Sequence, residues 1–259
     1  MSPTSLTLHR YNCINQGYTE DLGDGVSLTL MLIPDGEFMM GAPKDEPDSV
    51  DRERPQHLVR VSRFLMGRYP VTQAQWRVVA GYEKVDRELT LDPSNFKGDD
   101  LPVEGVSWYD AVEFCQRLSR TTGKNYHLPS EAQWEYACQA ETETVYHFGD
   151  EITKDLANYL GEQTTPVGQY PANRWELYDL HGNVWEWCQD YWHENYEGAP
   201  TDGSGWIEGG ESNRRVRRGG SWYDDAWFCR SACRDWCNPD GDYDDVGFRV
   251  CCSPPRAVQ

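Results

Sequence analysis

The second half of this sequence has no segment with the spacing of an amphipathic helix. Beyond Ala140 the chain is dense in glycine, tryptophan, tyrosine, aspartate and asparagine, and it shows only short strand patterns. Such a segment can fold only if large side chains fill its interior. The chain supplies 11 tryptophans and 15 tyrosines, which bury a large area per residue. We therefore expect a loop-rich half held together by aromatic packing and loop hydrogen bonds.

Strand patterns lie mainly in the first 70 residues. Residues 26–40 predict two strands on either side of a Pro34-Asp35-Gly36 turn, and residues 58–69 alternate as a further strand. Two polar stretches, 42–56 and 83–101, are typical of solvated loops. The first part of the chain therefore predicts short strands separated by loops.

Capping residues mark the expected helices. Thr72, Ser107 and Ser130 each precede a helical pattern, and the pattern after Ser107 extends to Arg120. Gln133 stands at the capping-box position after Ser130. The expected fold class is α+β, with two helices, short strands and a loop-rich second half.

The charge balance argues against several kinds of partner. The net charge is −19, so phosphate backbones and anionic membranes are repelled, and we expect neither nucleic-acid binding nor membrane insertion. The first residues, Met1 to Leu6, lack the basic start and apolar stretch of a signal peptide. A cytoplasmic protein is expected.

The length of 259 residues suits one domain with an appendage. Residues 1–25 are polar and mixed, which predicts an irregular lead or a docking arm before a domain over 26–252. Arginines between 214 and 218 alternate around Val216, and this favours an edge strand over a binding patch.

The nine cysteines are an odd number, and without a secretory signal they predict reduced, mostly buried thiols. Cys229, Cys233 and Cys237 lie four residues apart and would line one face of a helix. Zinc sites usually pair close ligands with a distant second pair, and no histidine lies near these three. Buried or randomised thiols are therefore preferred to a metal site.

Seven motifs occur in a fixed order along residues 26–252. They include Leu-Pro-Ser-Glu-Ala-Gln-Trp-Glu-Tyr-Ala at 128–137, His-Gly-Asn-Val-Trp-Glu-Trp at 181–187, Gly-Gly-Ser-Trp at 219–222 and Gly-Phe-Arg at 247–249. The remaining motifs lie at 33–41, 69–72 and 102–108. This series resembles the formylglycine-generating enzymes, or sulfatase-modifying factors. The resemblance implies a variant of the C-type lectin fold.

The family's activity needs a pair of cysteines that hold copper, and the resemblance places the first pair member at residue 224. That residue is Asp224, and a carboxylate is a poor ligand for copper(I). Counting on gives Cys229 as the second, although the following Arg-Ser-Ala-Cys-Arg fits a shorter stretch in which Cys229 precedes a structural arginine. The histidines also lack the spacing of the family's non-heme iron enzymes. We expect no copper and no enzyme activity.

The segment 222–245 has the composition of a binding surface. It contains six aromatic residues and seven aspartates, but no Leu, Ile, Val, Met, Lys, Glu or Gln. A core segment would carry branched aliphatic residues, and a solvated loop would carry lysine and glutamate. Rigid rings beside short polar groups are instead typical of surfaces that bind other proteins.

This segment is also similar to the variable region of proteins diversified by retroelements. In those systems adenine randomisation turns asparagine codons into Tyr, Asp, Phe, Cys and related residues, but never into Trp, Lys, Glu, Gln or Met. Trp222, Trp227 and Trp236 would thus be fixed, with Trp227 and Trp236 as central anchors. The expected ligand-binding residues are Tyr223, Asp224, Asp225, Trp227, Phe228, Cys233, Asp235, Trp236, Cys237, Tyr243, Asp244 and Asp245. The ligand is unknown, and a protein is expected.

The resemblance to the formylglycine-generating enzymes further implies a structural calcium site at 179–186. Its ligands would be the side chains of Asp179 and Glu186 and the carbonyls of Gly182 and Val184, because calcium prefers oxygen ligands. The alternative is that Trp185 and its neighbours simply anchor a loop.

Two other functions stay open beside the variable binding protein. One is a copper-dependent or other oxidase of the family. The other is an undiversified accessory domain that works beside a kinase or another signalling protein through residues 1–25.

Overall fold

The computed structural model describes residues 14–253, and its largest sheet joins both ends of that range. The five strands follow the order β1-β2-β5-β11-β6, and the paired neighbours run antiparallel. They are β1 (Gly17–Gly23), β2 (Val26–Ile33), β5 (Phe64–Gly67), β11 (Cys251–Cys252) and β6 (Tyr126–His127). The described chain therefore begins and ends in one sheet.

Three helices form, one more than the two expected: α1 (Gln73–Ala80), α2 (Trp108–Thr122) and α3 (Glu131–Gln139). The predicted caps Thr72, Ser107 and Ser130 are confirmed, since each side chain accepts a backbone N–H three residues on. The short α1 is stable in this context because it buries Trp76, which supplies support that an isolated helix of this length lacks. Within residues 14–253 no helix is long and apolar enough to cross a membrane.

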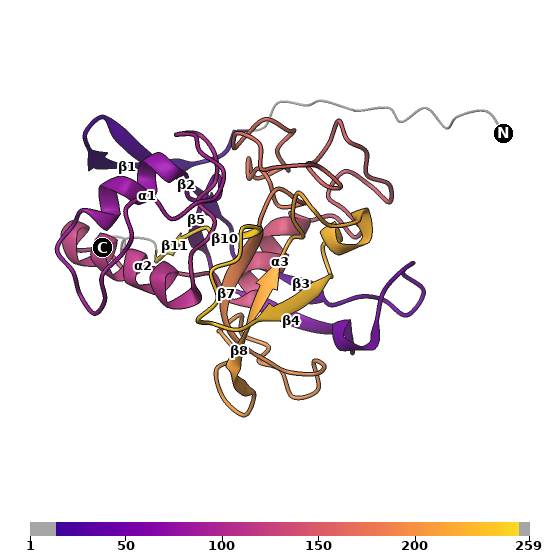
Figure 1. Ribbon diagram of the computed structural model, residues 1–259. Helices are drawn as coiled ribbons and strands as arrows, with labels where there is room; N and C mark the ends of the chain where they lie inside the picture. Colours follow the sequence, from indigo (N-terminus) through magenta and orange to yellow (C-terminus); the bar gives the residue numbers. More distant parts are fainter. Residues whose placement is uncertain (1–13, 254–259) are drawn as a thin grey trace.

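A second sheet occupies the loop-rich half, with four strands in the order β10-β7-β8-β9. They are β7 (Trp185–Trp192), β8 (Glu211–Arg218), β9 (Arg234–Cys237) and β10 (Val246–Gly247). A separate pair is formed by β3 (Gly36–Met40) and β4 (His57–Val61). In Figure 1, β7 and α3 lie between the group formed by β1, α1 and α2 and the β3–β4 pair. Two 3-10 turns, η1 (Asp51–Glu53) and η2 (Ala226–Cys229), complete the elements, and the class is α+β as expected.

The strand predictions for the first half are confirmed in part. The segment 26–40 does form two strands, but β2 pairs with β5 while β3 pairs with β4. The single strand expected over 58–69 is two strands, because the chain passes from one sheet to another at residues 62–63. Alternation identifies a strand but not the sheet that it joins.

Two further expectations need correction. Residues 17–23, placed in an irregular lead, form β1, because Glu20 accepts hydrogen bonds from Tyr126 (2.6 Å) and Lys124 (2.7 Å) and Leu22 is buried. Residues 1–13 of the expected arm lie outside the described residues. The arginines of 214–218 lie on β8, which is central rather than an edge, with β7 and β9 on either side.

Aromatic packing fills the interior as expected. The rings of Trp76 and Phe114 stack with centroids 5.6 Å apart, and Phe248 meets Phe114 edge-on at 5.2 Å. Four further tryptophans, Trp134, Trp185, Trp187 and Trp192, are almost fully buried. All eight cysteines of the described range are buried as well.

Buried ion pairs tie the second half to the first. Glu131 on α3 accepts from Arg218 (2.9 Å) and Arg234 (2.7 Å), which come from β8 and β9. Glu53 pairs with Arg230 at 2.7 Å, and neither side chain is more than 2% exposed. Glu53 belongs to the 42–56 stretch that was expected to be a solvated loop. That expectation was wrong at this point, because the Glu53 carboxylate neutralises the buried Arg230.

Candidate functional site

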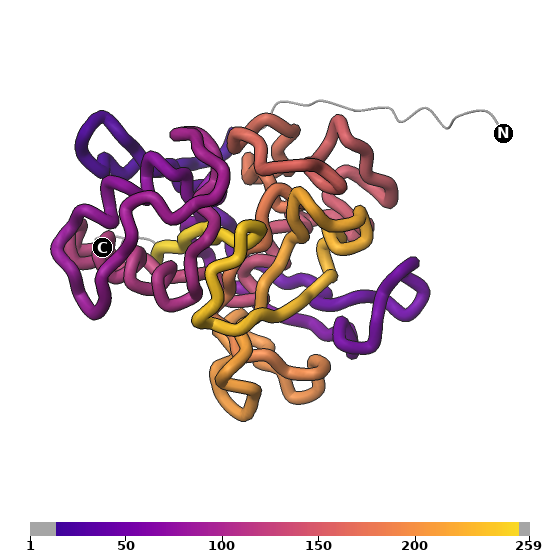
Figure 2. The backbone as a smooth tube through the Cα atoms, in the orientation of Figure 1, coloured from indigo at the N-terminus to yellow at the C-terminus, as the bar shows by residue number. Residues whose placement is uncertain are grey.

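The 222–245 segment crosses the middle of the molecule and supplies strand β9, as the yellow part of the chain in Figure 2 shows. Side chains alternate between the two faces of a strand, so Arg217 on β8 and its partner Asp235 on β9 point to one face. We call this surface the candidate face. It consists of Arg217, Trp227, Phe228, Asp235 and Asp245, with the buried ring of Trp185 beneath them.

Aromatic rings form the centre of the candidate face. The rings of Trp227 and Phe228 stack with centroids 3.5 Å apart, and Phe228 meets Trp185 edge-on at 6.0 Å. Trp185 is buried, whereas Trp227 and Phe228 are half-buried and pack against the edge of the core. Their remaining surface is rigid and amphipathic, and such rings bind ligands at a low entropic cost.

Arg217 holds the acidic groups of the face together. Its guanidinium lies 2.8 Å from Asp235 and 3.5 Å from Asp245, and it stacks 4.6 Å from the centroid of the Trp185 ring. Burial raises the pKa of the Asp245 carboxyl, and the charge of Arg217 opposes that shift. One arginine between two aspartates makes this part of the face acidic.

A rim of exposed side chains surrounds the rings. Tyr223 is 70% exposed, and Asp225 and Asp244 are exposed as well. Tyr243 is half-buried. Trp222 donates from its indole to the carbonyl of Asp244 (3.2 Å), which ties the two ends of the segment together. The hydrogen bond from Trp222 therefore helps to hold the rim in place.

Asp224 is part of the frame and not a displayed residue, which corrects its expected role. Its Oδ2 accepts from the backbone (3.0 Å) and hydroxyl (2.5 Å) of Ser221 and from the indole of Trp185 (2.8 Å). Gly220 beside it has a φ of +72°, and a Cβ there would lie 2.7 Å from the sulfur of Cys229. The Gly-Gly-Ser turn is thus fixed by close packing.

Three more of the expected ligand-binding residues need correction. Cys233 is fully buried and Cys237 is 9% exposed, so neither thiol is displayed. Trp236 pairs with Val216, which places it on the sheet face opposite Asp235, where Arg214 stacks 3.7 Å above its ring. Trp236 is therefore no anchor of the candidate face. The cysteines were also expected on one helix face, but residues 234–237 form a strand.

Two residues at the candidate face were missed from the sequence. Trp185 was treated only as a loop anchor, and Arg217 was assigned to an edge strand. The alternation of Arg215, Val216 and Arg217 was the available signal, because it places both arginines on one face. The pattern could not show which strands lie beside β8, because those strands come from other parts of the chain.

The residues at the family's copper positions do not fit a copper(I) ion. The carboxylate of Asp224 is occupied by three donors, as described above. Cys229 is fully buried, and burial raises the pKa of its thiol well above the usual value. Copper(I) binds thiolates, so a protonated thiol beside an occupied carboxylate is a poor site.

Cys229 contacts a buried histidine that gives stability a pH dependence. The Nδ1 of His181 donates to the Cys229 carbonyl (2.6 Å), and its Nε2 accepts from the backbone N–H of His147 (3.2 Å). Both bonds require a neutral ring, and burial lowers the pKa of His181 to about 4. Since this lies below the unfolded value, the stabilisation is complete above pH 6.5 and is lost as the pH falls from 6.5 to 4.

We therefore expect the free energy of unfolding of the natural protein to fall by about 2 kcal/mol more than that of His181→Asn between pH 7 and pH 5. Urea unfolding at both pH values measures this difference. Burial raises the pKa of Asp190 and Glu135 to about 7, which acts in the opposite direction. Their effect is common to both proteins and cancels in the comparison. Equal pH slopes for the two proteins would contradict the assignment.

Of the four residues expected to bind calcium, Glu186 has its carboxylate engaged by other side chains, while one oxygen of Asp179 has no hydrogen-bond partner among the described residues. Both oxygens of Glu186 accept from Arg249 at 2.6 Å, and one also accepts from the indole of Trp134 at 2.8 Å. One oxygen of Asp179 accepts from the backbone of Gly168 (2.7 Å), and burial raises the pKa of its carboxyl to about 6. Gly182 accepts the amide of Val184 (3.0 Å). Residues 14–253 contain no cluster of three or more His, Cys, Asp or Glu arranged to hold a metal ion.

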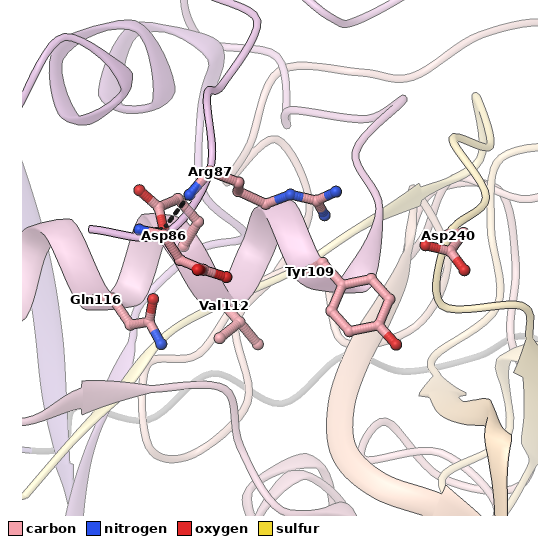
Figure 3. A pocket seen from close by; sticks show the side chains of 7 residues that line it. Asp86, Arg87, Tyr109, Val112, Gln116 and Asp240 are labelled. Carbon is pink, nitrogen blue, oxygen red and sulfur yellow. Dashed lines mark hydrogen bonds between the residues drawn. The ribbon is translucent and has the colours of Figure 1, made fainter. Parts of the chain in front are cut away.

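A cavity of about 390 Å³ lies against α2 and reaches the 222–245 segment at Asp240. Its lining is Asp86, Arg87, Tyr109, Val112, Glu113, Gln116 and Asp240. Figure 3 shows Tyr109 and the extended side chain of Arg87 on the side nearer Asp240. The guanidinium of Arg87 lies 5.4 Å from the Tyr109 ring centroid.

Comparison with known proteins identifies a family over most of the chain. Residues 26–254 match the sulfatase-modifying factor enzyme 1-like domain. A serine/threonine-protein kinase pkn1 of Chlamydia caviae is 32% identical over 242 residues, which cover 85% of this chain and 37% of the kinase. The chain thus spans little more than a third of the length of that relative.

Two solved structures share the fold. PvdO from Pseudomonas aeruginosa has a TM-score of 0.82 and 31% identity over 92% of this chain and 98% of PvdO. Variable protein 1 of Treponema denticola has a TM-score of 0.75 and 26% identity over 94% of this chain and all of that protein. These similarities support the expected architecture.

Proposed function

Because the chain belongs to the sulfatase-modifying factor enzyme 1-like family but has Asp224 where the copper pair needs its first cysteine, we propose that it is a non-catalytic binding protein. It displays diversified side chains of 222–245 on a fixed scaffold of the C-type lectin type. The ligand, a protein, contacts the candidate face and its rim. No copper is involved.

One observation carries this proposal: the segment sets exposed rim residues on a buried frame that ion pairs tie to distant parts of the chain. The frame contains the arginines Arg230 and Arg234, both at most 1% exposed. The exposed rim contains Tyr223, Asp225 and Asp244, which all belong to the set that adenine randomisation produces. If adenine randomisation varies this surface, the residues that vary must be exposed, and the residues that support the fold must be buried and unvaried.

The similarity to a Treponema variable protein supports the same function. It extends over 94% of this chain and all of that protein. A binding surface of aromatic and acidic side chains also agrees with the composition of the segment.

The gene supplies the most direct test. We expect a near-copy of its 3′ end beside a reverse transcriptase gene, with differences almost only at adenines. Those differences should fall in codons such as those of Tyr223, Asp225 and Asp244, and they should spare Trp227 and Arg230. A missing copy, or differences spread evenly over buried and exposed positions, would exclude diversification.

An oxidase of this family is the first alternative. It requires a copper(I) ion held by a thiol pair. We expect reconstitution with copper(I) to leave the purified protein without a stoichiometric thiolate-bound ion. One bound copper per chain, lost in Cys229→Ser, would favour the oxidase.

An undiversified accessory domain is the second alternative, and the similarity to the chlamydial kinase favours it. Such a domain would recruit its partner through the start of the chain. Removing residues 1–13 tests this without disturbing β1. The accessory role would be favoured if the shortened protein no longer recovers the partner while the full-length Tyr223→Ala variant still recovers it.

A further inference from the structure

Arg215 is a buried arginine without a carboxylate. It lies on β8 and is 6% exposed, and its side chain forms no ion pair with a carboxylate of the described residues. Its Nε and Nη1 are buried without a partner. The buried Arg218 and Arg234 on β8 and β9 pair with Glu131, and the half-buried Arg217 pairs with Asp235. Arg215 is the exception among them.

Two aromatic rings hold the guanidinium of Arg215 in place. Its central carbon lies 4.1 Å from the centroid of the Trp108 ring and 4.0 Å from that of Tyr191. Both rings lie within cation–π distance of the group, while its Nε and Nη1 donors have no hydrogen-bond partner among the described residues. The group is therefore oriented before any ligand arrives.

The position of Arg215 adjoins the candidate face. Arg215 and Arg217 are two residues apart on one strand, so both side chains point to the same side of the sheet. The cross-strand neighbours of Arg215 are Cys237 on β9 and Tyr191 on β7. The ring of Tyr109, which lines the 390 Å³ cavity, meets Trp108 edge-on with centroids 5.3 Å apart.

An unneutralised guanidinium in this position is costly in the free protein. Desolvation disfavours the charged group, and burial accordingly lowers the pKa of Arg215, while Tyr191, Tyr109 and Asp190 act against that shift. An anion that reaches the guanidinium removes this cost and gains charge-assisted hydrogen bonds. A planar carboxylate matches the stacked guanidinium better than a tetrahedral phosphate does.

We propose that Arg215, clamped between Trp108 and Tyr191, is the binding site for a carboxylate carried by the ligand. The inference rests on the proposed function in one respect, since it assigns the carboxylate to the partner that occupies the candidate face. The ligand thus presents an acidic side chain or a chain terminus to this end of the sheet. Arg215, Trp108 and Tyr191 all lie outside the variable segment, so every variant of that segment would keep this carboxylate site.

The test uses the full protein and sodium acetate as the probe, with sodium chloride at equal ionic strength as reference. In a proton–nitrogen NMR spectrum, acetate is expected to shift saturably the signals of the Arg215 Nε–H and of the indole N–H of Trp108, and the indole signal reports binding in the variants. Arg215→Met should weaken acetate binding at least about 10-fold, as expected for loss of a charge-assisted bond. Arg214→Met is the matched control, because Arg214 also stacks on a ring but has Glu211 at 3.0 Å. It should leave acetate binding unchanged within about twofold.

A structural role for Arg215 predicts a different result. Arg215→Met would then melt well below the natural protein, whereas removal of an unpaired buried charge should leave the acetate-free melting temperature equal or higher. A large drop in that temperature, or the absence of a saturable shift with acetate, would overturn the proposal. A stronger shift with phosphate than with acetate would overturn its carboxylate assignment. A negative result from the gene would refute diversification alone, because acetate binding at Arg215 does not depend on it.

Discussion

Glu131→Gln is expected to lower the free energy of unfolding by about 3–5 kcal/mol, which is a large part of the stability of a typical domain. The carboxylate of Glu131 is buried and accepts from Arg234 through both oxygens (2.7 Å each), from Arg218 (2.9 Å) and from the Tyr196 hydroxyl (2.9 Å). A neutral amide cannot balance two guanidinium groups, and Glu135 then faces them alone. Two buried charges lose their main partner at once.

Urea unfolding followed by tryptophan fluorescence measures this effect. Glu83→Gln is a matched control, because Glu83 pairs with Arg120 at 2.8 Å on the surface, where both side chains are about half exposed or more. Its loss should change stability by less than about 1 kcal/mol. If the two variants unfold at the same urea concentration, the network around Glu131 does not hold the two halves of the chain together.

Cys233→Asp is expected to cost more than about 4 kcal/mol, whereas Tyr223→Asp should change stability by less than about 0.5 kcal/mol. Both substitutions stay within the residue types that adenine randomisation produces, so the sequence alone treats them alike. The structure separates them, because Cys233 is fully buried and Tyr223 is 70% exposed. An aspartate at 233 would be buried in the core close to Glu53, and the nearby Arg230 and Arg218 already pair with Glu53 and Glu135.

Thermal melting of both variants, each compared with the natural protein, checks this contrast. Cys233→Ser separates the effect of charge from that of polarity, and it should fall between the other two. If Cys233→Asp has the same melting temperature as the natural protein, residue 233 must be able to reach solvent. The division into frame and rim would then be wrong. The expected outcome limits natural variation to the rim.

Much of the first half could be predicted because its signals are local. The caps at Thr72, Ser107 and Ser130 depend on hydrogen bonds within one turn, and all three are confirmed. The assignment of strands to sheets depends on partners far along the chain, as when β5 pairs with the distant β11. No local pattern contains that information.

The candidate site was predicted in part for a similar reason. The composition of residues 222–245 was enough to identify the segment, because a binding surface differs in its residue types from a core segment or a solvated loop. It could not tell that Cys233 is buried or that Trp236 faces away from Asp235, because both depend on how β9 lies against β8. The pairing of Arg230 with Glu53, 177 residues away, was equally invisible.

The same pairings decide whether the variable segment could be transplanted. Residues 222–245 carry Arg230 and Arg234, but the carboxylates that neutralise them belong to Glu53 and Glu131 elsewhere in the chain. A host scaffold that received the loop alone would inherit two buried positive charges without counterions. The segment is therefore no self-contained cassette, and an engineer who wished to reuse its surface would have to move the distant acids with it.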